Sequence, residues 1–263
     1  MRKILQKTLF KAELSQRFNT QEQATEFLLS CKDASFTVTK SEEKPTKRYP
    51  AAPFTTSTLQ QEAGRKFSMS VSQTMSIAQK LYERGLITYM RTDSVNLSDL
   101  ALNACKKEIV EMFGDNYSSR RNYTTHSKGA QEAHEAIRPT YINNHTIEGT
   151  AAEKKLYELI WKRTIASQMA DAKLEKTNIT INISNREEKY LCQGEVVLFE
   201  GFMKVYQHSV NEDEETENIN QKLLPAVSQG EILEHLCSKA TENYNNHPPR
   251  YNEASLVKKL EDL

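Results

Sequence analysis

The sequence Gly85-Leu86-Ile87-Thr88-Tyr89-Met90-Arg91-Thr92-Asp93-Ser94 marks the point at which a helical pattern becomes an extended one. Gly85 suits the position just after a helix, where the backbone commonly turns left-handed. The residues that follow, Leu86 to Tyr89, are strand-like. Side chains two residues apart on an extended segment share a face, so Tyr89 and Arg91 are expected to point to the same side.

Two short amphipathic helices precede this stretch. Ser57-Thr58-Leu59-Gln60 and Ser70-Val71-Ser72-Gln73 both match the capping-box pattern that begins a helix. Two helices joined by a tight turn and followed by a strand predict a winged helix-turn-helix, a unit that often presents a helix to DNA. A helical hairpin used only for packing fits this pattern equally well.

Further helices are expected from caps and apolar spacing. Thr20 can begin a helix that runs to Ser30, and Ser98 can begin one over residues 99–113 that ends at Gly114. Another helix is expected around 151–169.

Strand patterns lie on both sides of this helical region. Phe36–Lys40 alternates like a half-buried strand and leads into a charged connector with prolines, residues 41–53. Asn178–Ser184 alternates strictly, and residues 201–206 complete a run of short strands. We therefore expect an α+β fold in which the β material before residue 50 and after residue 175 pairs into one domain, with the helices inserted between its halves.

Composition narrows the class of protein. The chain has 263 residues, and its 35 Lys and Arg balance its 35 Asp and Glu, so a basic partner surface must be local. No apolar run is long enough for a membrane span and no secretory signal is evident, which predicts a cytoplasmic protein without membrane contact. The four cysteines never form a Cys-x-x-Cys pair, so a zinc site is not expected.

Tyr89 and Arg91 suit a phosphodiester substrate. A tyrosine hydroxyl, with a reference pKa of about 10, is a weak nucleophile unless charge developing on its target is stabilised. Arg91 can bind the non-bridging oxygens of a phosphate while Tyr89 attacks the phosphorus. A phosphotyrosine conserves the bond energy, so no nucleoside triphosphate is needed. Taken alone, however, Tyr-x-Arg is more often structural, with the tyrosine packed in a core.

A second candidate cluster lies at His134-Glu135-Ala136-Ile137-Arg138. Histidine can bind a phosphate oxygen or relay a proton. Arg138 would share the face of His134 if the segment were helical, and Glu135 would either orient the histidine or face solvent. A second histidine at zinc-protease spacing is missing, so metal hydrolysis is not expected.

Several motifs, taken in order, resemble the central region of the bacterial type IA DNA topoisomerases, and the resemblance spans essentially the whole chain. The motifs are Ala52-Pro53-Phe54-Thr55-Thr56-Ser57-Thr58-Leu59-Gln60, Ala78-Gln79-Lys80-Leu81-Tyr82-Glu83, the Tyr89 stretch, Ala133–Pro139, and Pro248-Pro249-Arg250-Tyr251 with Glu253-Ala254-Ser255-Leu256-Val257.

The resemblance implies an ATP-independent enzyme that cleaves and rejoins single-stranded DNA through a 5′-phosphotyrosine and relaxes negative supercoils. Tyr89 matches the nucleophile, Arg91 the arginine that positions it and stabilises the transition state, and His134 a histidine near the scissile phosphate. The resemblance also implies DNA contacts or active-site motif positions for Gln79, Glu83, Thr88, Thr92, Asp93 and Arg138. For Gln79 and Thr88, a structural role is equally compatible with the family pattern.

The resemblance further implies a helical domain at 50–175 that carries the tyrosine, on a β-rich arch formed by 1–49 and 176–247. Residues 248–263 would begin another helical domain, and a pattern that ends inside a helix suggests a piece of a longer protein. No stretch resembles the Toprim domain, which binds Mg²⁺ in the family, or the C-terminal zinc modules. We therefore expect no cofactor in this fragment, and we expect the fragment alone to be inactive and monomeric.

The partners that the resemblance implies are single-stranded or negatively supercoiled DNA and the missing Toprim domain, with a nucleoid-associated location in the cytoplasm. The alternative from another class is a non-catalytic module that binds single-stranded DNA or acts as a scaffold.

Overall fold

The computed structural model describes residues 9–124, 134–206, 224, 227–244, 247 and 250–261. The chain divides into two compact units. The first unit comprises residues 1–47, 173–198 and 216–247, and the second comprises residues 48–172, 199–215 and 248–263. None of the helices in the described parts is long and apolar enough to cross a membrane.

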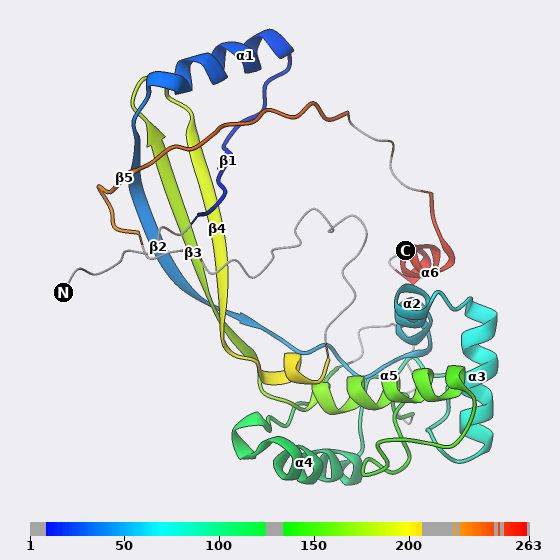
Figure 1. Cartoon of the computed structure of the whole chain (residues 1–263). Helices are drawn as coiled ribbons and strands as arrows, with labels where there is room; N and C mark the ends of the chain where they lie inside the picture. The colour runs from blue at the N-terminus through cyan, green and yellow to red at the C-terminus, as the bar shows by residue number, and fades with distance from the viewer. Residues whose placement is uncertain are drawn as a thin grey trace. The chain divides into compact units, whose positions relative to one another are not determined.

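The first unit is built on a curled antiparallel sheet (Figure 1). Its five strands run in the order β1-β4-β3-β2-β5. Their bounds are β1 Glu13–Leu14, β2 Phe36–Arg48, β3 Ala172–Ile183, β4 Lys189–Phe199 and β5 Ile232–Leu233. The expected pairing of strands from both ends of the sequence is confirmed, because β1 pairs with β4 and β2 lies beside β3.

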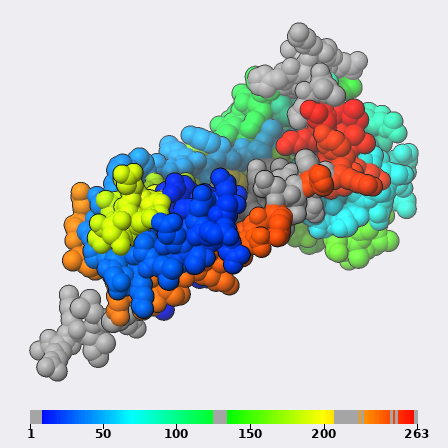
Figure 2. Space-filling model, turned by 90° about the horizontal axis from the view of Figure 1, so that it is seen from above, coloured from blue at the N-terminus to red at the C-terminus, as the bar shows by residue number. Residues whose placement is uncertain are grey.

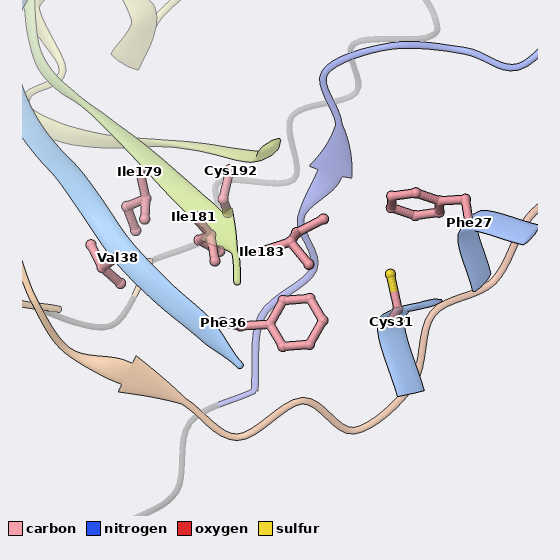
Figure 3. Close-up of a cluster of buried hydrophobic side chains, with 8 residues drawn as sticks. All are labelled: Phe27, Cys31, Phe36, Val38, Ile179, Ile181, Ile183 and Cys192. Atoms are coloured by element: carbon pink, nitrogen blue, oxygen red, sulfur yellow. The ribbon is translucent and has the colours of Figure 1, made fainter. Parts of the chain in front are cut away.

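Helix α1 (Gln21–Ser30) and the short helix η1 (Cys31–Asp33) supply the other side of this unit's core. Thr20 caps α1 as expected, by accepting from the Gln23 N–H. Figure 3 shows Phe27 and Cys31 directed toward apolar side chains of the sheet. The buried cluster consists of Phe27, Cys31, Phe36, Val38, Ile179, Ile181, Ile183 and Cys192. The alternating residues of β3 thus bury one face of the strand, as their period of two predicts.

The expected connector after Lys40 is wrong in its first part, because β2 continues to Arg48. Most residues of this extension are exposed, so it lacks the apolar alternation by which a strand is recognised. Pro45 is tolerated there because β5 borders β2 only around Phe36 and Thr37, which leaves the later part as an edge within the described residues.

The second unit is mostly helical. Its α-helices are α2 Thr56–Phe67, α3 Val71–Glu83, α4 Asp99–Phe113, α5 Ala151–Ser167 and α6 Glu253–Glu261. Two short helices accompany them, η2 Asp115–Tyr117 and η3 Gly201–Lys204. The buried side of α5 includes Leu156, Ile160 and Trp161. The whole chain is therefore a mixed α/β protein.

Side-chain caps fix where these helices begin. Ser70 caps α3 by accepting from the Gln73 N–H, and Ser98 caps α4, so these two N-caps are confirmed. The expected capping box at Ser57 is wrong, because α2 begins two residues earlier. Thr55 is its N-cap, and the Thr58 hydroxyl accepts a hydrogen bond from the Thr55 N–H. A threonine can therefore take the role usually filled by Glu or Gln at this position.

The expected strand at residues 201–206 is also wrong, since the chain forms η3 there. Gly201 has a positive φ of 51°, and a Cβ at this residue would lie 2.4 Å from the Ala170 carbonyl oxygen. The Phe202 N–H donates to that same carbonyl. This close approach of two backbones requires glycine and turns the chain out of a strand.

The C-terminal helix α6 packs on α2 (Figure 1), and Figure 2 shows its red atoms at the surface beside cyan residues of the same unit. Glu253 accepts from the Val71 N–H at 2.7 Å, so its carboxylate lies at the start of α3. A Cβ at Gly64 would approach Ala254 Cβ to 3.2 Å, which shows how closely the two helices meet. Whether residues 248–263 begin a further domain stays a prediction.

Truncation in the core of the first unit should be costly. Ile179→Ala removes a side chain that is 1% exposed, so we expect the free energy of unfolding to fall by about 2–5 kcal/mol in urea titrations followed by circular dichroism. The matched control is Ile232→Ala, at a side chain that is 72% exposed, with an expected change within about 0.5 kcal/mol. Equal losses in the two variants would contradict the assignment of this core.

Candidate functional site

The end of α3 directs the chain toward Tyr89. The Gly85 N–H donates to the Tyr82 carbonyl at 2.8 Å, and the Leu86 N–H donates to the Leu81 carbonyl at 2.9 Å. This pair of bonds is the Schellman motif, with Gly85 in the left-handed conformation at φ 68°. The expectation that Gly85 ends the helix is confirmed.

Burial alternates along the segment that follows. Tyr89, Arg91 and Asp93 are exposed, whereas Met90, Thr92 and Ser94 are buried. This alternation is what an extended chain on a protein surface produces. The alternative that Tyr89 packs in a core is wrong, because its side chain is 44% exposed.

The Tyr89 segment lies against the segment that follows His134. Ile87 and Pro139 form an antiparallel bridge, and the Thr140 N–H donates to the Leu86 carbonyl at 3.0 Å. The Thr88 N–H donates to the Arg138 carbonyl at 2.9 Å. The two candidate clusters are therefore hydrogen-bonded neighbours. These are isolated bridges and no named strand, so the winged-helix assignment stays a prediction.

Thr88 is the residue that joins the two segments most closely. Its hydroxyl donates to the Ala136 carbonyl at 2.7 Å and accepts from the Arg138 N–H at 2.9 Å. Both hydrogen-bonding roles of the hydroxyl are therefore taken up inside the protein. Thr92 is buried, and its hydroxyl accepts from the Ser94 N–H.

The segment from His134 to Pro139 is extended, so the premise that it is helical is wrong. Arg138 consequently does not share a helical face with His134. Its guanidinium donates to the Glu135 carboxylate at 2.6 Å and to the Pro139 carbonyl at 2.9 Å. Glu135 also accepts from the Ser98 N–H at 2.6 Å, at the start of α4. Glu135 therefore links the Ser98 backbone to the Arg138 side chain. His134, in contrast, is exposed.

Burial tends to raise the pKa of the Glu135 carboxyl, but the hydrogen bonds from Arg138 and Ser98 outweigh it, and the net pKa lies below its ordinary value. The carboxylate is therefore charged at neutral pH and binds Arg138 as an ion pair. This pair orients the Arg138 guanidinium along its own segment, where the Nε atom is buried without a hydrogen-bond partner among the described residues.

The last turns of α3 border the same surface. The Tyr82 ring meets the Tyr89 ring edge-on, with centroids 5.3 Å apart. On the same helix the Gln79 side chain donates to the Glu83 carboxylate at 2.9 Å, and both residues are exposed. The contact between Tyr82 and Tyr89 was not predicted from the sequence, because a spacing of seven residues across a helix end gives no signal of contact.

Tyr89, Arg91 and His134 differ in one respect from the threonines and Glu135 around them. Each is exposed, and no hydrogen bond or ion pair links its side chain to any other residue in the described parts of the chain. Surrounding threonines and Glu135 are committed to internal bonds. The arrangement thus offers a hydroxyl, a guanidinium and an imidazole to a ligand from outside. In the same described parts, no group of three or more His, Cys, Asp or Glu could hold a metal ion.

The structure is thus a mixed α/β protein whose helical unit exposes a tyrosine, an arginine and a histidine, a set of side chains suited to anionic ligands. Comparison with known proteins identifies the family. A family model described as DNA topoisomerase matches residues 3–263. The chain therefore belongs to the bacterial type IA DNA topoisomerase family.

Individual relatives support this assignment. The prokaryotic-type DNA topoisomerase 1 of Acanthamoeba polyphaga mimivirus is 45% identical over 258 residues, which cover 93% of this chain and 30% of that protein. The DNA topoisomerase 1 of Rickettsia bellii is 46% identical over 92% of this chain and 32% of its own length. The full-length topoisomerase I of Thermotoga maritima superposes with a TM-score of 0.77 at 33% identity, over 95% of this chain and 41% of that one. The chain thus spans about a third of these curated relatives.

The Glu135 network should stabilise the protein in a pH-dependent way. Because the folded pKa of Glu135 lies below its unfolded value of about 4.3, its contribution is present above that value and is lost as the pH falls through the folded pKa. We expect Glu135→Gln to lower the free energy of unfolding at pH 7 and to differ little from the parent at pH 2, in urea titrations.

The control for this experiment is Glu111→Gln, at an exposed position of α4. A loss for Glu135→Gln that is the same size at both pH values would show that the network does not depend on the charge of Glu135.

Proposed function

We propose that this chain supplies the tyrosine-bearing part of an enzyme that cleaves and rejoins single-stranded DNA and thereby relaxes negative supercoils. The observation that carries the proposal is the exposed Tyr89 on a segment hydrogen-bonded to the one that follows His134. The family membership supports it, since the DNA topoisomerase model matches essentially the whole chain.

In this proposal the Tyr89 hydroxyl oxygen attacks a backbone phosphorus. A bond forms between that oxygen and the phosphorus, and the bond from phosphorus to the 3′ oxygen of the neighbouring sugar breaks. The tyrosine proton passes to solvent or a base, and the 3′ oxygen takes up a proton. The product is a 5′-phosphotyrosine, and the reverse attack by the 3′ hydroxyl rejoins the strand. One phosphodiester replaces another, so ATP is not required.

Arg91 and His134 have distinct roles in this step. Arg91 would bind the non-bridging oxygens, where negative charge accumulates as the phosphorus becomes five-coordinate. His134 would donate a hydrogen bond to the same phosphate region. Their freedom from other hydrogen bonds among the described residues supports these roles. Gln79, Glu83 and Asp93 lie near Tyr89 in the sequence and are exposed, and we propose that they contact the DNA strand.

Thr88, Thr92 and Arg138 would contribute differently. The two hydroxyls and the terminal guanidinium nitrogens of Arg138 are bonded within the protein, which supports a role in holding the DNA-facing surface in place. We propose that direct DNA contact falls to the exposed residues. The winged-helix character of α2 and α3 is part of the same proposal, with α3 as the element that faces DNA.

The remaining half of the active site would come from a Toprim domain, which this sequence does not resemble anywhere. Mg²⁺ would be bound there and would offset phosphate charge. The described residues of this chain do not fit a magnesium site of their own. We propose that the chain by itself is monomeric and inactive in relaxation, and that it acts with DNA in the cytoplasm near the nucleoid.

A chimera tests the catalytic proposal. This chain would replace the matching segment of Rickettsia bellii DNA topoisomerase 1, which is 46% identical. With Mg²⁺ and a single-stranded oligonucleotide, we expect a covalent adduct that carries a 3′ label but not a 5′ label, because Tyr89 retains the 5′ phosphate. Tyr89→Phe should abolish the adduct, since no hydroxyl remains to attack.

The matched control is Tyr141→Phe, at a tyrosine that is 64% exposed elsewhere in the second unit. It should leave adduct formation unchanged. Absence of the adduct in a folded chimera, or its persistence in Tyr89→Phe, would favour the rival function, a non-catalytic module that binds single-stranded DNA.

DNA binding by the chain alone should be weak and should depend on salt. The net charge is zero, so only local cations such as Arg91 can displace counterions. In titrations of a fluorescent oligonucleotide, we expect the logarithm of the association constant to fall with the logarithm of salt concentration, and Arg91→Gln to reduce that slope by about 0.7. Tight binding that is insensitive to salt would contradict this prediction.

A further inference from the structure

The hydroxyl of Thr56 spans the backbone on both sides of Arg91. It donates to the Met90 carbonyl at 2.8 Å and accepts from the Thr92 N–H at 2.9 Å. The Thr56 N–H in turn donates to the Thr92 carbonyl at 2.9 Å. The two peptide groups that flank Arg91 are thus attached to a single residue at the start of α2, more than thirty positions earlier in the sequence.

Thr56 is not needed to begin its own helix. The N-cap of α2 is Thr55, and Thr58 completes the capping box. Thr56 occupies the first helical position, where a side-chain hydroxyl has no required role in capping. Its hydroxyl is therefore available for the Arg91 segment, and all of its hydrogen bonds go there, including a longer one to the Thr92 carbonyl at 3.1 Å.

Arg91 depends on its backbone for its direction. Its side chain is exposed, and no hydrogen bond or ion pair anchors the guanidinium within the described residues. A long flexible side chain of this kind is aimed mainly by the backbone from which it projects. A transition-state contact is sensitive to misplacement, and an error of about 1 Å can cost a hundredfold in rate.

We propose that Thr56 is a positioning residue for Arg91 and that its hydroxyl fixes the backbone from which the guanidinium reaches the scissile phosphate. This inference rests on the proposed function. Thr56 does not touch the substrate. It acts by keeping Met90 and Thr92 in register, in the same way that the Thr88 hydroxyl binds the backbone of Ala136 and Arg138.

Two substitutions separate the hydroxyl from the shape of the side chain. Thr56→Val keeps the branched shape and removes the hydrogen bonds, whereas Thr56→Ser keeps the hydroxyl. In the chimera at saturating DNA, we expect Thr56→Val to slow adduct formation by about ten- to a hundredfold with little change in DNA affinity. Thr56→Ser should restore most of the rate.

A matched control is Thr74→Val in α3. The Thr74 hydroxyl is buried and donates only to the Ser70 carbonyl of its own helix turn, at 2.9 Å. This variant loses a threonine hydroxyl from the same unit without affecting the Arg91 segment. Its adduct rate should match that of the parent.

A double-mutant cycle asks whether Thr56 acts through Arg91. In an Arg91→Ala background, Thr56→Val should add little further loss, because the group that it positions is gone. Equal losses in both backgrounds would overturn the proposal and show that Thr56 supports the unit in a general way.

Hydrogen exchange on the isolated chain tests the same contact without catalysis. The Thr92 amide should exchange faster in Thr56→Val than in the parent, and Thr74→Val should leave it unchanged. Unchanged exchange at Thr92 would overturn the proposal. This readout decides the question even if the Arg91→Ala background forms too few adducts for the double-mutant cycle. If the parent chimera forms no adduct while Thr92 exchange responds as expected, the proposed function fails and the contact stands.

Discussion

The contact on which the candidate site depends is the one between the Thr88 hydroxyl and the backbone of residues 136–138. Through it, a single side chain joins the segment that carries Tyr89 to the segment that carries His134. A half-buried hydroxyl that both donates and accepts holds two chain segments at one distance, and losing either bond would leave a backbone group without that partner. These hydrogen bonds therefore hold the backbone that carries the exposed Tyr89 side chain.

The same device recurs along the segment. Thr56 holds the peptides around Arg91, and the Thr92 hydroxyl accepts from the Ser94 N–H. Glu135 fixes the start of α4 and the Arg138 side chain. Threonines and one ion pair thus replace a regular sheet as the means of ordering this surface. The outward side chains stay free among the described residues because the inward ones satisfy the backbone.

Much of the local structure follows from the sequence. Thr20, Ser70 and Ser98 begin their helices as expected, and Gly85 ends α3, because each signal acts over three or four residues. The strict alternation of residues 178–184 likewise predicts β3. The exposed extension of β2 carries no such signal, because it is a strand through its pairing with β3 and has no apolar alternation of its own. The helix η3 depends on a backbone contact with Ala170 that no local pattern records.

The candidate site, too, could be predicted from the sequence only in part. The sequence by itself determined that Tyr89 and Arg91 share an extended segment, and the motifs around them determined the family. Only the tertiary structure decided that Arg138 and Thr88 bond within the protein, that Glu135 serves Ser98, and that Thr56 holds the Arg91 backbone. The physical reason is distance along the chain. These hydrogen bonds join residues 34 to 50 positions apart, except for the pair Glu135 and Arg138, which are three positions apart in a segment that is not helical.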